Sequence, residues 1–392
     1  MIKIKIQFFV TMLVMRRIYS YLILTSIVLI SSLVLWSPFV LKTTNLLGIN
    51  ISEPGFLTIY KHYDGPLYVV PAKTFYNPQA IKNLHLEMTA PTKYFAAHLP
   101  LYPALIRVVK EIGIFGQLGY LKSMLSVNLL ATIGLVLFFY YLLKKLKLTK
   151  NPLVLASVLL FLPRFLVVRS VGAPESLFIL MILLSLFFFE KDRFWLAGLF
   201  GGLATMTKTP GLLLFGAYGL VFIERLLKDR KINWNWLGIL LIPLGLLSVF
   251  GIYAVQYKDF FAYFHSGDNI HLVFPYSVFN FQKTWVGTAW LEEIIFYYFM
   301  YGLTVIYLKD SKYRSFFYFG LVFFTATLFV QHRDISRYSL PLWPLALIAF
   351  EKFFTSKRFL LIYIILLPAI FLYAWNLLLY NVMPISNWYP FL

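Results

Sequence analysis

A short polar stretch at residues 62–68, His-Tyr-Asp-Gly-Pro-Leu-Tyr, holds the side chains best suited to chemistry in this sequence. Its carboxylate, Asp64, lies close in sequence to His62 and Tyr68 and is followed by Gly-Pro, which turns the chain. An aspartate in such a place could accept the proton of a substrate hydroxyl as a general base. The alternative is a structural role, because Asp-Gly is a common turn pair.

A second carboxylate, Glu175, follows Pro174 at the expected start of an apolar helix. Proline is favoured at the first helical position, and a carboxylate in the first turn complements the helix dipole. Glu175 is therefore expected either to cap this helix or to contact a substrate directly.

Cations gather at the ends of other apolar runs, namely Arg164, Arg169, Lys208, Arg333 and Arg337, with His332 beside the last two. Cations at membrane depth are costly and usually face a cavity or a partner. Guanidinium groups also bind phosphate through paired hydrogen bonds. These residues could clamp a lipid phosphate. The alternative is that they extend toward lipid headgroups or pair with Asp334 and Glu175.

The composition indicates what must position these side chains. Hydrophobic residues make up 60% of the chain and aromatic residues 19%, far above the values of soluble domains. The sequence therefore predicts an integral membrane protein. The net charge is +19, and the Lys and Arg residues stand in small clusters between apolar runs. This distribution favours topology signals over nucleic-acid binding. No cysteine is present, so disulfides and thiolate chemistry are excluded.

The apolar runs predict about eleven transmembrane helices, since a span needs roughly 20 apolar residues. The fold class expected is an all-α polytopic membrane protein. The expected spans cover residues 18–41, 124–143, 152–169, 173–189, 194–208, 210–226, 234–256, 289–308, 314–331, 338–355 and 358–380.

Lys and Arg clusters fall in alternate gaps between these spans, as the positive-inside rule requires when the N-terminus is cytoplasmic. This frame places all six histidines, Asp64 and the C-terminus on the other side. We therefore expect the active site to open on the non-cytoplasmic side of the cell membrane.

Two outer loops are expected to be larger than simple connections. The first, about 42–123, contains an amphipathic helical stretch at 99–112 that we expect to lie on the membrane surface. The second, about 257–288, is rich in Tyr, Phe and Trp, as interfacial segments are. No boundary for a separate soluble domain is visible, so residues 1–392 are expected to form a single transmembrane domain.

The sequence resembles the GT-C glycosyltransferases, and within them the PIG-V type mannosyltransferases (GPI mannosyltransferase 2-like) of lipid-linked sugar pathways. Five stretches carry the resemblance in the family's order, at residues 62–68, 99–107, 172–178, 201–211 and 337–344. The departures are Tyr63 where the family usually has Trp, the additional Pro66, and Lys208 where it tends to have Arg.

The resemblance implies a GT-C-like helical fold, a polyprenyl- or dolichyl-phosphate sugar as donor, and an essential acid in the first outer loop. Asp64 is the residue that matches this acid. The expected reaction is an inverting transfer of a sugar, mannose by the resemblance, to a lipid-linked or glycan acceptor. Substrate contacts are expected from His62, Tyr68, Glu175, Lys208, His332, Arg333 and Arg337. No cofactor, metal or nucleic acid is expected.

The alternative function is a polytopic transporter or lipid flippase. Transporters place polar groups near the bilayer midplane and often contain internal repeats with broken helices. In this sequence the expected spans carry few charges, and the polar residues gather toward one face. A glycosyltransferase is therefore the preferred interpretation.

Overall fold

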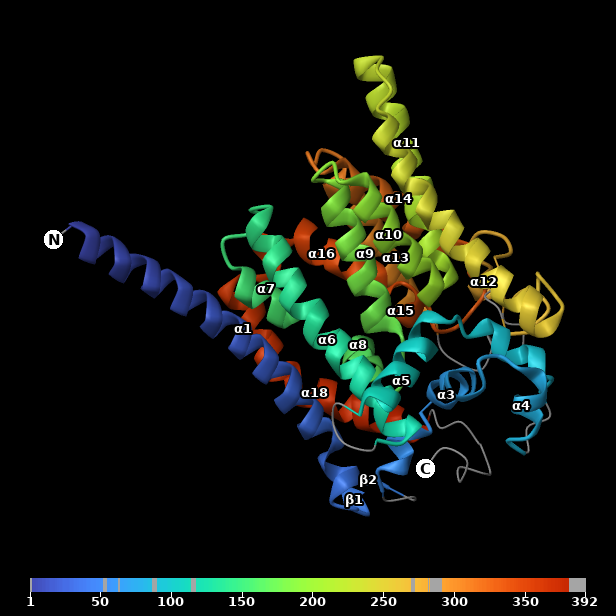
Figure 1. Ribbon diagram of the computed structural model, residues 1–392. Helices are drawn as coiled ribbons and strands as arrows, with labels where there is room; N and C mark the ends of the chain where they lie inside the picture. Colours follow the sequence, from blue (N-terminus) through green and yellow to red (C-terminus); the bar gives the residue numbers. More distant parts are fainter. Residues whose placement is uncertain are drawn as a thin grey trace.

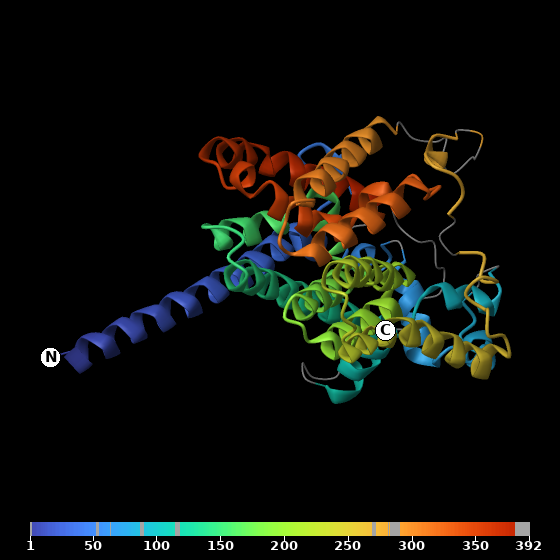
Figure 2. The same ribbon diagram turned by 90° about the horizontal axis from the view of Figure 1, so that it is seen from above.

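The computed structural model describes residues 2–51, 55–62, 64–86, 90–113, 118–268, 272–280, 282 and 291–380, with backbone alone over residues 2–17. Figure 1 shows a bundle of helices, from which the first part of α1 (Ile2–Val40) extends away. The same extension is seen from above in Figure 2. In the part of the chain described, the only sheet is a hairpin of β1 (Asn45–Leu46) and β2 (Ile49–Asn50).

Five helical segments are long and apolar enough to cross a membrane. They are Ile18–Val40 in α1, α6 (Tyr120–Lys145), Thr209–Asp229, which joins η2 (Thr209–Leu212) to α11 (Leu213–Asp229), Trp234–Tyr257, which joins η3 (Trp234–Leu240) to α12 (Leu241–Tyr257), and α18 (Lys357–Tyr380). The protein is therefore a multi-pass helical membrane protein, and five predicted spans are confirmed as helices of sufficient length. The count of eleven spans is not confirmed.

Four further helices occupy predicted spans but are shorter: α9 (Glu175–Phe189), α10 (Phe194–Thr207), α13 (Glu292–Leu308) and α14 (Arg314–Leu328). They hold 14 to 17 residues each. At about 1.5 Å per residue these helices are about 21–26 Å long, less than the hydrocarbon thickness of about 30 Å.

Two predicted spans are not continuous helices, and these predictions are wrong. Residues 152–169 form α7 (Pro152–Leu159) and α8 (Pro163–Val168). Residues 338–355 lie in the end of α15 (Ile335–Tyr338), η5 (Leu340–Leu342), α16 (Trp343–Ala349) and α17 (Glu351–Phe354). Pro163, Pro341 and Pro344 lack the N–H that a continuing helix needs, and their rings clash with the preceding turn.

The first predicted outer loop is a compact set of short helices. It contains α2 (Leu57–Tyr60), α3 (Gly65–Thr74), α4 (Pro78–Lys82), η1 (Thr92–Ala97) and α5 (Leu101–Ile112). The amphipathic helix is confirmed as α5, which packs on α3 and α6. Tyr102 of α5 is fully buried, and its hydroxyl donates to the Met124 carbonyl over 2.9 Å. This packing fixes the loop against the bundle.

The second predicted outer loop begins where α12 ends at Tyr257. Its described parts run from 258 to 268 and from 272 to 280 and include η4 (Ser277–Phe279), with the single residue 282 beyond them. His271, one of the histidines predicted to lie outside, falls beyond the described residues.

Small residues allow α10 to pack closely against η3 and α12. A Cβ added to Gly198 would lie 1.9 Å from the Gly238 carbonyl oxygen. One added to Gly245 would lie 2.6 Å from the Gly202 carbonyl oxygen. Such spacing brings two backbones together, as small-residue motifs do in membrane helices. It holds α10 in place, and Lys208 directly follows this helix.

Replacing Gly245 tests this packing. We expect Gly245→Ala to destabilise the protein by about 1–3 kcal/mol, because the new methyl group would collide with the backbone of α10. The matched control is Gly251→Ala in the same helix, where no atom lies within 4 Å of the added Cβ. Chemical denaturation in detergent micelles measures both, and equal stabilities would contradict the close packing.

Candidate active site

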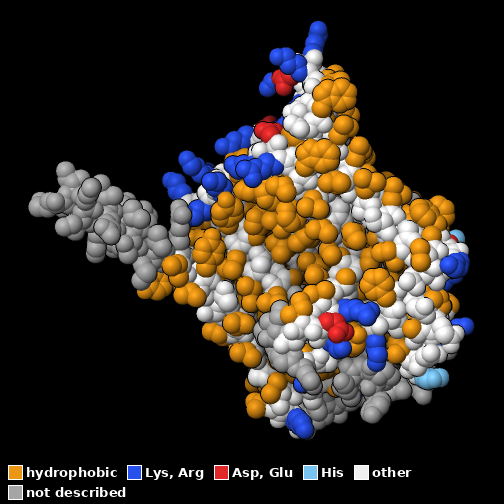
Figure 3. Space-filling view, in the orientation of Figure 1, with side chains coloured by type: hydrophobic (Ala, Val, Ile, Leu, Met, Phe, Trp, Pro, Cys, Tyr) orange, Lys and Arg blue, Asp and Glu red, His pale blue; other side chains and the backbone are white. Residues whose placement is uncertain are grey.

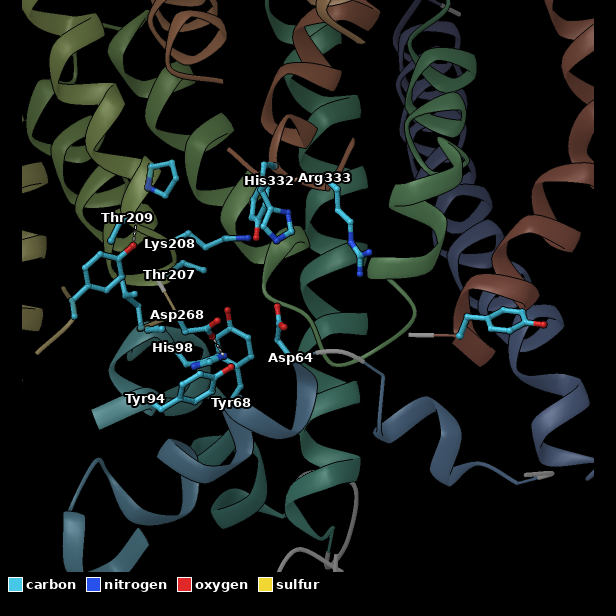
Figure 4. A pocket seen from close by; sticks show the side chains of 16 residues that line it. Asp64, Tyr68, Tyr94, His98, Thr207, Lys208, Thr209, Asp268, His332 and Arg333 are labelled. Carbon is cyan, nitrogen blue, oxygen red and sulfur yellow. Dashed lines mark hydrogen bonds and ion pairs between the residues drawn. The ribbon is translucent and has the colours of Figure 1, made fainter. Parts of the chain in front are cut away.

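A polar cavity of about 440 Å³ lies between the first predicted outer loop and the helix ends of the bundle. Figure 4 shows its walls. Predicted site residues lining it are Asp64, Tyr68, Lys208, His332 and Arg333. They come from the start of α3, the end of α10 and the loop before α15. The structure therefore brings together five predicted residues that are distant in sequence.

Asp64 occupies the N-cap position of α3, yet its side chain makes no capping hydrogen bond. The carboxylate instead accepts from Arg337 Nη1 at Oδ2 over 2.8 Å. Two glycines allow this placement. A Cβ on Gly65 would lie 2.9 Å from the Gly172 carbonyl oxygen, and one on Gly172 would lie 2.2 Å from Met124 Sδ. The turn that carries Asp64 thus lies directly against the segment before α9.

Arg337 of α15 joins the two predicted carboxylates. Its Nη1 donates to Asp64, and its Nε donates to Glu175 Oε1 over 2.7 Å. The side chains of Arg337 and Glu175 are 5% and 3% exposed, whereas that of Asp64 is 29% exposed. One guanidinium therefore holds a buried carboxylate on one side and a pocket-facing carboxylate on the other.

Lys208 completes this network. Its Nζ donates to Glu175 Oε1 over 2.8 Å and lies 5.6 Å from the centre of the Tyr338 ring. Lys208 has extended backbone angles between the end of α10 at Thr207 and the start of η2 at Thr209. Glu175 therefore organises two cations, and it also lines a second cavity described below, so its substrate contact stays a prediction.

The network keeps Asp64 ionised. Burial disfavours its charged form, but Arg337, His98 and Lys208 together outweigh this effect, so the pKa of Asp64 lies below its ordinary value. Within the described residues no hydrogen bond to Asp64 Oδ1 is formed. Asp64 can accept a proton at this atom while Arg337 retains the other oxygen.

His62 lies elsewhere than expected. It is 2% exposed and does not line the main cavity, but a small void behind Asp64 that Arg164 and Arg337 also line. Burial, with the charges of Arg164 and Arg337, lowers the pKa of His62 to about 3, so its imidazole is neutral. The His62 side chain thus lies behind the Asp64 carboxylate and outside the polar cavity, and its substrate contact stays a prediction.

His332 and Arg333 lie at the opposite wall from the first outer loop (Figure 4). The backbone N–H of Asp334 donates to His332 Nδ1 over 3.0 Å, and the imidazole ring meets Tyr338 edge-on. Burial lowers the pKa of His332. Arg333 is exposed and lines the cavity.

Two further predicted cations, Arg164 and Arg169, do not line the polar cavity. Arg164 pairs with Asp334, as the alternative interpretation held. Arg169 is 1% exposed and donates to the Ser31 and Ser32 hydroxyls and the Leu160 carbonyl. It fastens α1 to the break between α7 and α8. Neither arginine is therefore placed to bind a phosphate in this cavity.

A second, apolar cavity of about 320 Å³ adjoins the polar one. It lies between α9, α12 and α14 and is lined by apolar side chains such as Phe178, Phe250 and Phe323. The two cavities share Lys208, Thr209, Pro210, Tyr263 and Tyr338. A ligand with a polar head and an apolar tail could therefore occupy both.

Comparisons with known proteins find distant matches among solved structures. A scan against protein-family models and a search of curated proteins find no match. Among the solved structures that match is the crystal structure of the Archaeoglobus fulgidus oligosaccharyltransferase tethered with an acceptor peptide, at 12% sequence identity and a TM-score of 0.48. The match covers 93% of this chain and 56% of that chain, so this chain spans little more than half its length. At this distance the likeness assigns no activity.

Among the cavity residues that were not predicted as site residues are Tyr94, His98 and Asp268. Tyr94 lies in η1, His98 directly follows it, and Asp268 lies in the loop after α12. Tyr94 and His98 stand in no local catalytic pattern, and Asp268 stands in a His-x-x-Asp-x-x-His stretch whose spacing suits metal ligands but offers no further close ligand. The available signal was the outer placement of all histidines, which includes His98.

The buried network makes a prediction about stability. We expect Arg337→Gln to destabilise the protein by about 3–5 kcal/mol, because it leaves the buried Glu175 and Asp64 without their shared counter-ion. Asp192→Asn is the control, since its carboxylate is 69% exposed and pairs with Arg225 at the surface. Such a pair contributes about 1 kcal/mol or less. Chemical denaturation that gives similar small losses for both variants would contradict the network's role.

Proposed function

We propose that the protein is a membrane glycosyltransferase of the GT-C type, which moves a sugar from a lipid phosphate to a hydroxyl acceptor. The observation that carries the proposal is the junction of the two cavities. A polar cavity with an ionised aspartate meets an apolar cavity at Lys208 and Tyr338. This arrangement suits a lipid-phosphate sugar, with its tail in the apolar cavity and its phosphate near Lys208 and Arg333.

The reaction follows from these placements. Asp64 Oδ1 takes the proton of the acceptor hydroxyl as its oxygen attacks the anomeric carbon. The bond from that carbon to the phosphate oxygen breaks, and the lipid phosphate leaves with the electron pair. Lys208 and Arg333 stabilise the negative charge on the phosphate. Attack opposite to the leaving group inverts the anomeric configuration. The protein's own cations supply the positive charge, so the proposed reaction requires no cofactor.

The finer assignment rests on the resemblance to the PIG-V type. We propose mannose as the sugar, a polyprenyl or dolichyl phosphate as carrier, and a lipid-linked or glycan acceptor. In support, four of the five resembling stretches contribute Asp64, Glu175, Lys208 and Arg337, which are joined in one network. Their meeting is what a shared site would require.

We also propose that the site faces away from the cytoplasm. Figure 3 shows Lys and Arg side chains gathered at the end of the molecule that carries the C-terminal part of α11, whereas α3 and α5 lie toward the other end in Figure 1. Basic residues favour the cytoplasmic side. The opposite end, with the polar cavity, would then lie outside.

Replacing Asp64 tests the mechanism. We expect Asp64→Asn to lower transfer by about 10²–10⁴-fold, because general-base catalysis contributes that much. The assay uses membranes of an expressing strain and radiolabelled polyprenyl-phosphate mannose. Glu111→Gln on α5 is the control, since Glu111 is an exposed acid of the same loop that does not line either cavity.

Full transfer by a folded Asp64→Asn variant would overturn the mechanism. Substrate movement across proteoliposomes without sugar transfer would favour the transporter or flippase instead. Thermal unfolding of both variants separates loss of chemistry from loss of fold.

Replacing Arg333 tests the proposed phosphate contact. We expect Arg333→Gln to raise the KM for the lipid-phosphate donor about tenfold or more, since hydrogen bonds to charged groups contribute about 1.5–3 kcal/mol. Its stability should change little because the side chain is exposed. Lys258→Gln is the control, because Lys258 is an exposed cation of the second outer loop away from both cavities. Equal donor KM values for both variants would exclude a phosphate at Arg333.

A further inference from the structure

Asp268 lines the same cavity as Asp64 but has a different environment. Its side chain is 39% exposed and hydrogen bonds with the Tyr94 hydroxyl. In the described part of the chain, no Lys or Arg pairs with it. Its carboxylate therefore keeps acceptor capacity for a ligand in the cavity.

The contrast with Asp259 in the same loop is informative. The Asp259 carboxylate accepts from Lys93 Nζ and lies against His265 Nδ1, each over 2.8 Å. It does not line either cavity. Asp259 thus has a structural role in joining the loop to η1, whereas Asp268 is directed to the cavity.

His98 stands beside Asp268. Its side chain is 4% exposed, and its Nε2 lies 4.0 Å from Asp268 Oδ2, too far for a direct hydrogen bond. Its Nδ1 has no hydrogen-bond partner among the described residues. The Tyr76 hydroxyl donates to the His98 carbonyl, and the Tyr68 ring packs edge-on at 4.8 Å. The imidazole is therefore firmly held, with hydrogen-bonding capacity that the described residues leave unused.

The protonation states suit a neutral, hydroxyl-bearing ligand. Burial lowers the pKa of His98 to about 4, so its imidazole is neutral and offers one donor and one acceptor. Burial and the nearby charge of Asp64 raise the pKa of Asp268 to about 6, so its carboxyl is ionised at neutral pH. A hydroxyl can accept from the imidazole N–H and donate to the carboxylate at once.

We propose that Asp268 and His98 bind the acceptor, and that this acceptor is a sugar with two adjacent hydroxyl groups. The proposal rests on the glycosyltransferase function. Figure 4 shows Lys208, His332 and Arg333 on one side of the cavity and Asp268, His98 and Tyr94 on the other. The donor phosphate binds at the first side. Asp268 and His98 hold one hydroxyl at the second side, which directs its neighbour to Asp64. Both are positioning residues, and the proton still passes to Asp64.

The test is Asp268→Asn, with Asp259→Asn as the matched control in the same loop. The donor is polyprenyl-phosphate mannose, and the acceptors are methyl α-D-mannopyranoside and its monodeoxy derivatives. We expect Asp268→Asn to raise the acceptor KM about tenfold while the donor KM and the release of mannose to water stay unchanged. Asp268→Glu should recover part of the loss, and Asp259→Asn should resemble the wild type.

The pH profile gives a second readout. Four titratable groups face Asp268. Tyr94 belongs to η1 and His98 directly follows η1, whereas Asp64 stands at the start of α3 and Arg337 lies in α15. Its pKa is raised, so the carboxyl becomes protonated as the pH falls through about 6. The acceptor KM of the wild type should rise over this range, while that of Asp268→Asn should not.

Two outcomes would overturn the acceptor subsite. One is that Asp268→Asn raises the donor KM as much as the acceptor KM, and the other is that Asp259→Asn raises the acceptor KM as much as Asp268→Asn does. If the wild type glycosylates no acceptor, the proposed function fails first. Saturation-transfer NMR of methyl α-D-mannopyranoside with the intact protein then decides the subsite separately. Binding lost in Asp268→Asn but kept in Asp259→Asn supports it, and any other pattern overturns it.

Discussion

The site depends on the ion pairs that the buried guanidinium of Arg337 forms with two carboxylates. The guanidinium binds Asp64 and Glu175, which lie 273 and 162 residues away in sequence. A charge withdrawn from water is tolerated only when partners of the opposite sign surround it. The turn before α3, the start of α9 and the short helix α15 must therefore meet at one point. Lys208 adds a fourth segment through Glu175.

This network separates two roles that a single carboxylate could not combine. Glu175 is 3% exposed and balances the charges of Arg337 and Lys208 at the edge of the apolar cavity. Asp64 has one oxygen on Arg337 and remains 29% exposed toward the cavity. The fixed charge lowers the pKa of Asp64, and a carboxylate that stays ionised is ready to receive a proton. Its modest basicity is offset by its fixed position beside the cavity.

The sequence predicted the parts of the site that local patterns can indicate. Asp64, Lys208 and Arg337 stand at turns or helix ends next to apolar runs, and α5 follows from its amphipathic spacing. The same reasoning failed where proline breaks an apolar run, as at Pro163. Hydropathy measures only how apolar a segment is, and it takes no account of the backbone N–H that proline lacks. The sequence reasoning also missed His98 and Asp268 as site residues. They come from the two predicted outer loops, and only the fold places His98 Nε2 4.0 Å from Asp268 Oδ2. His62 was expected beside Asp64 in the site, but it does not line the polar cavity. Residues that are close in sequence need not face the same cavity.

The short helices bear on the proposed lipid substrate, because their length affects the depth of the site. α9 and α10 have 15 and 14 residues, about 21–23 Å at 1.5 Å per residue, so they are shorter than a hydrocarbon layer of about 30 Å. Glu175 begins one helix, and Lys208 directly follows the other. We therefore expect the charged network to lie below the outer surface, at a depth that a lipid phosphate can reach with its tail still among apolar side chains. Irregular backbone such as η2 is tolerated at this depth because it lines the cavities instead of facing lipid. A full-length helix would carry Lys208 beyond the apolar cavity, and a single ligand could then no longer occupy both.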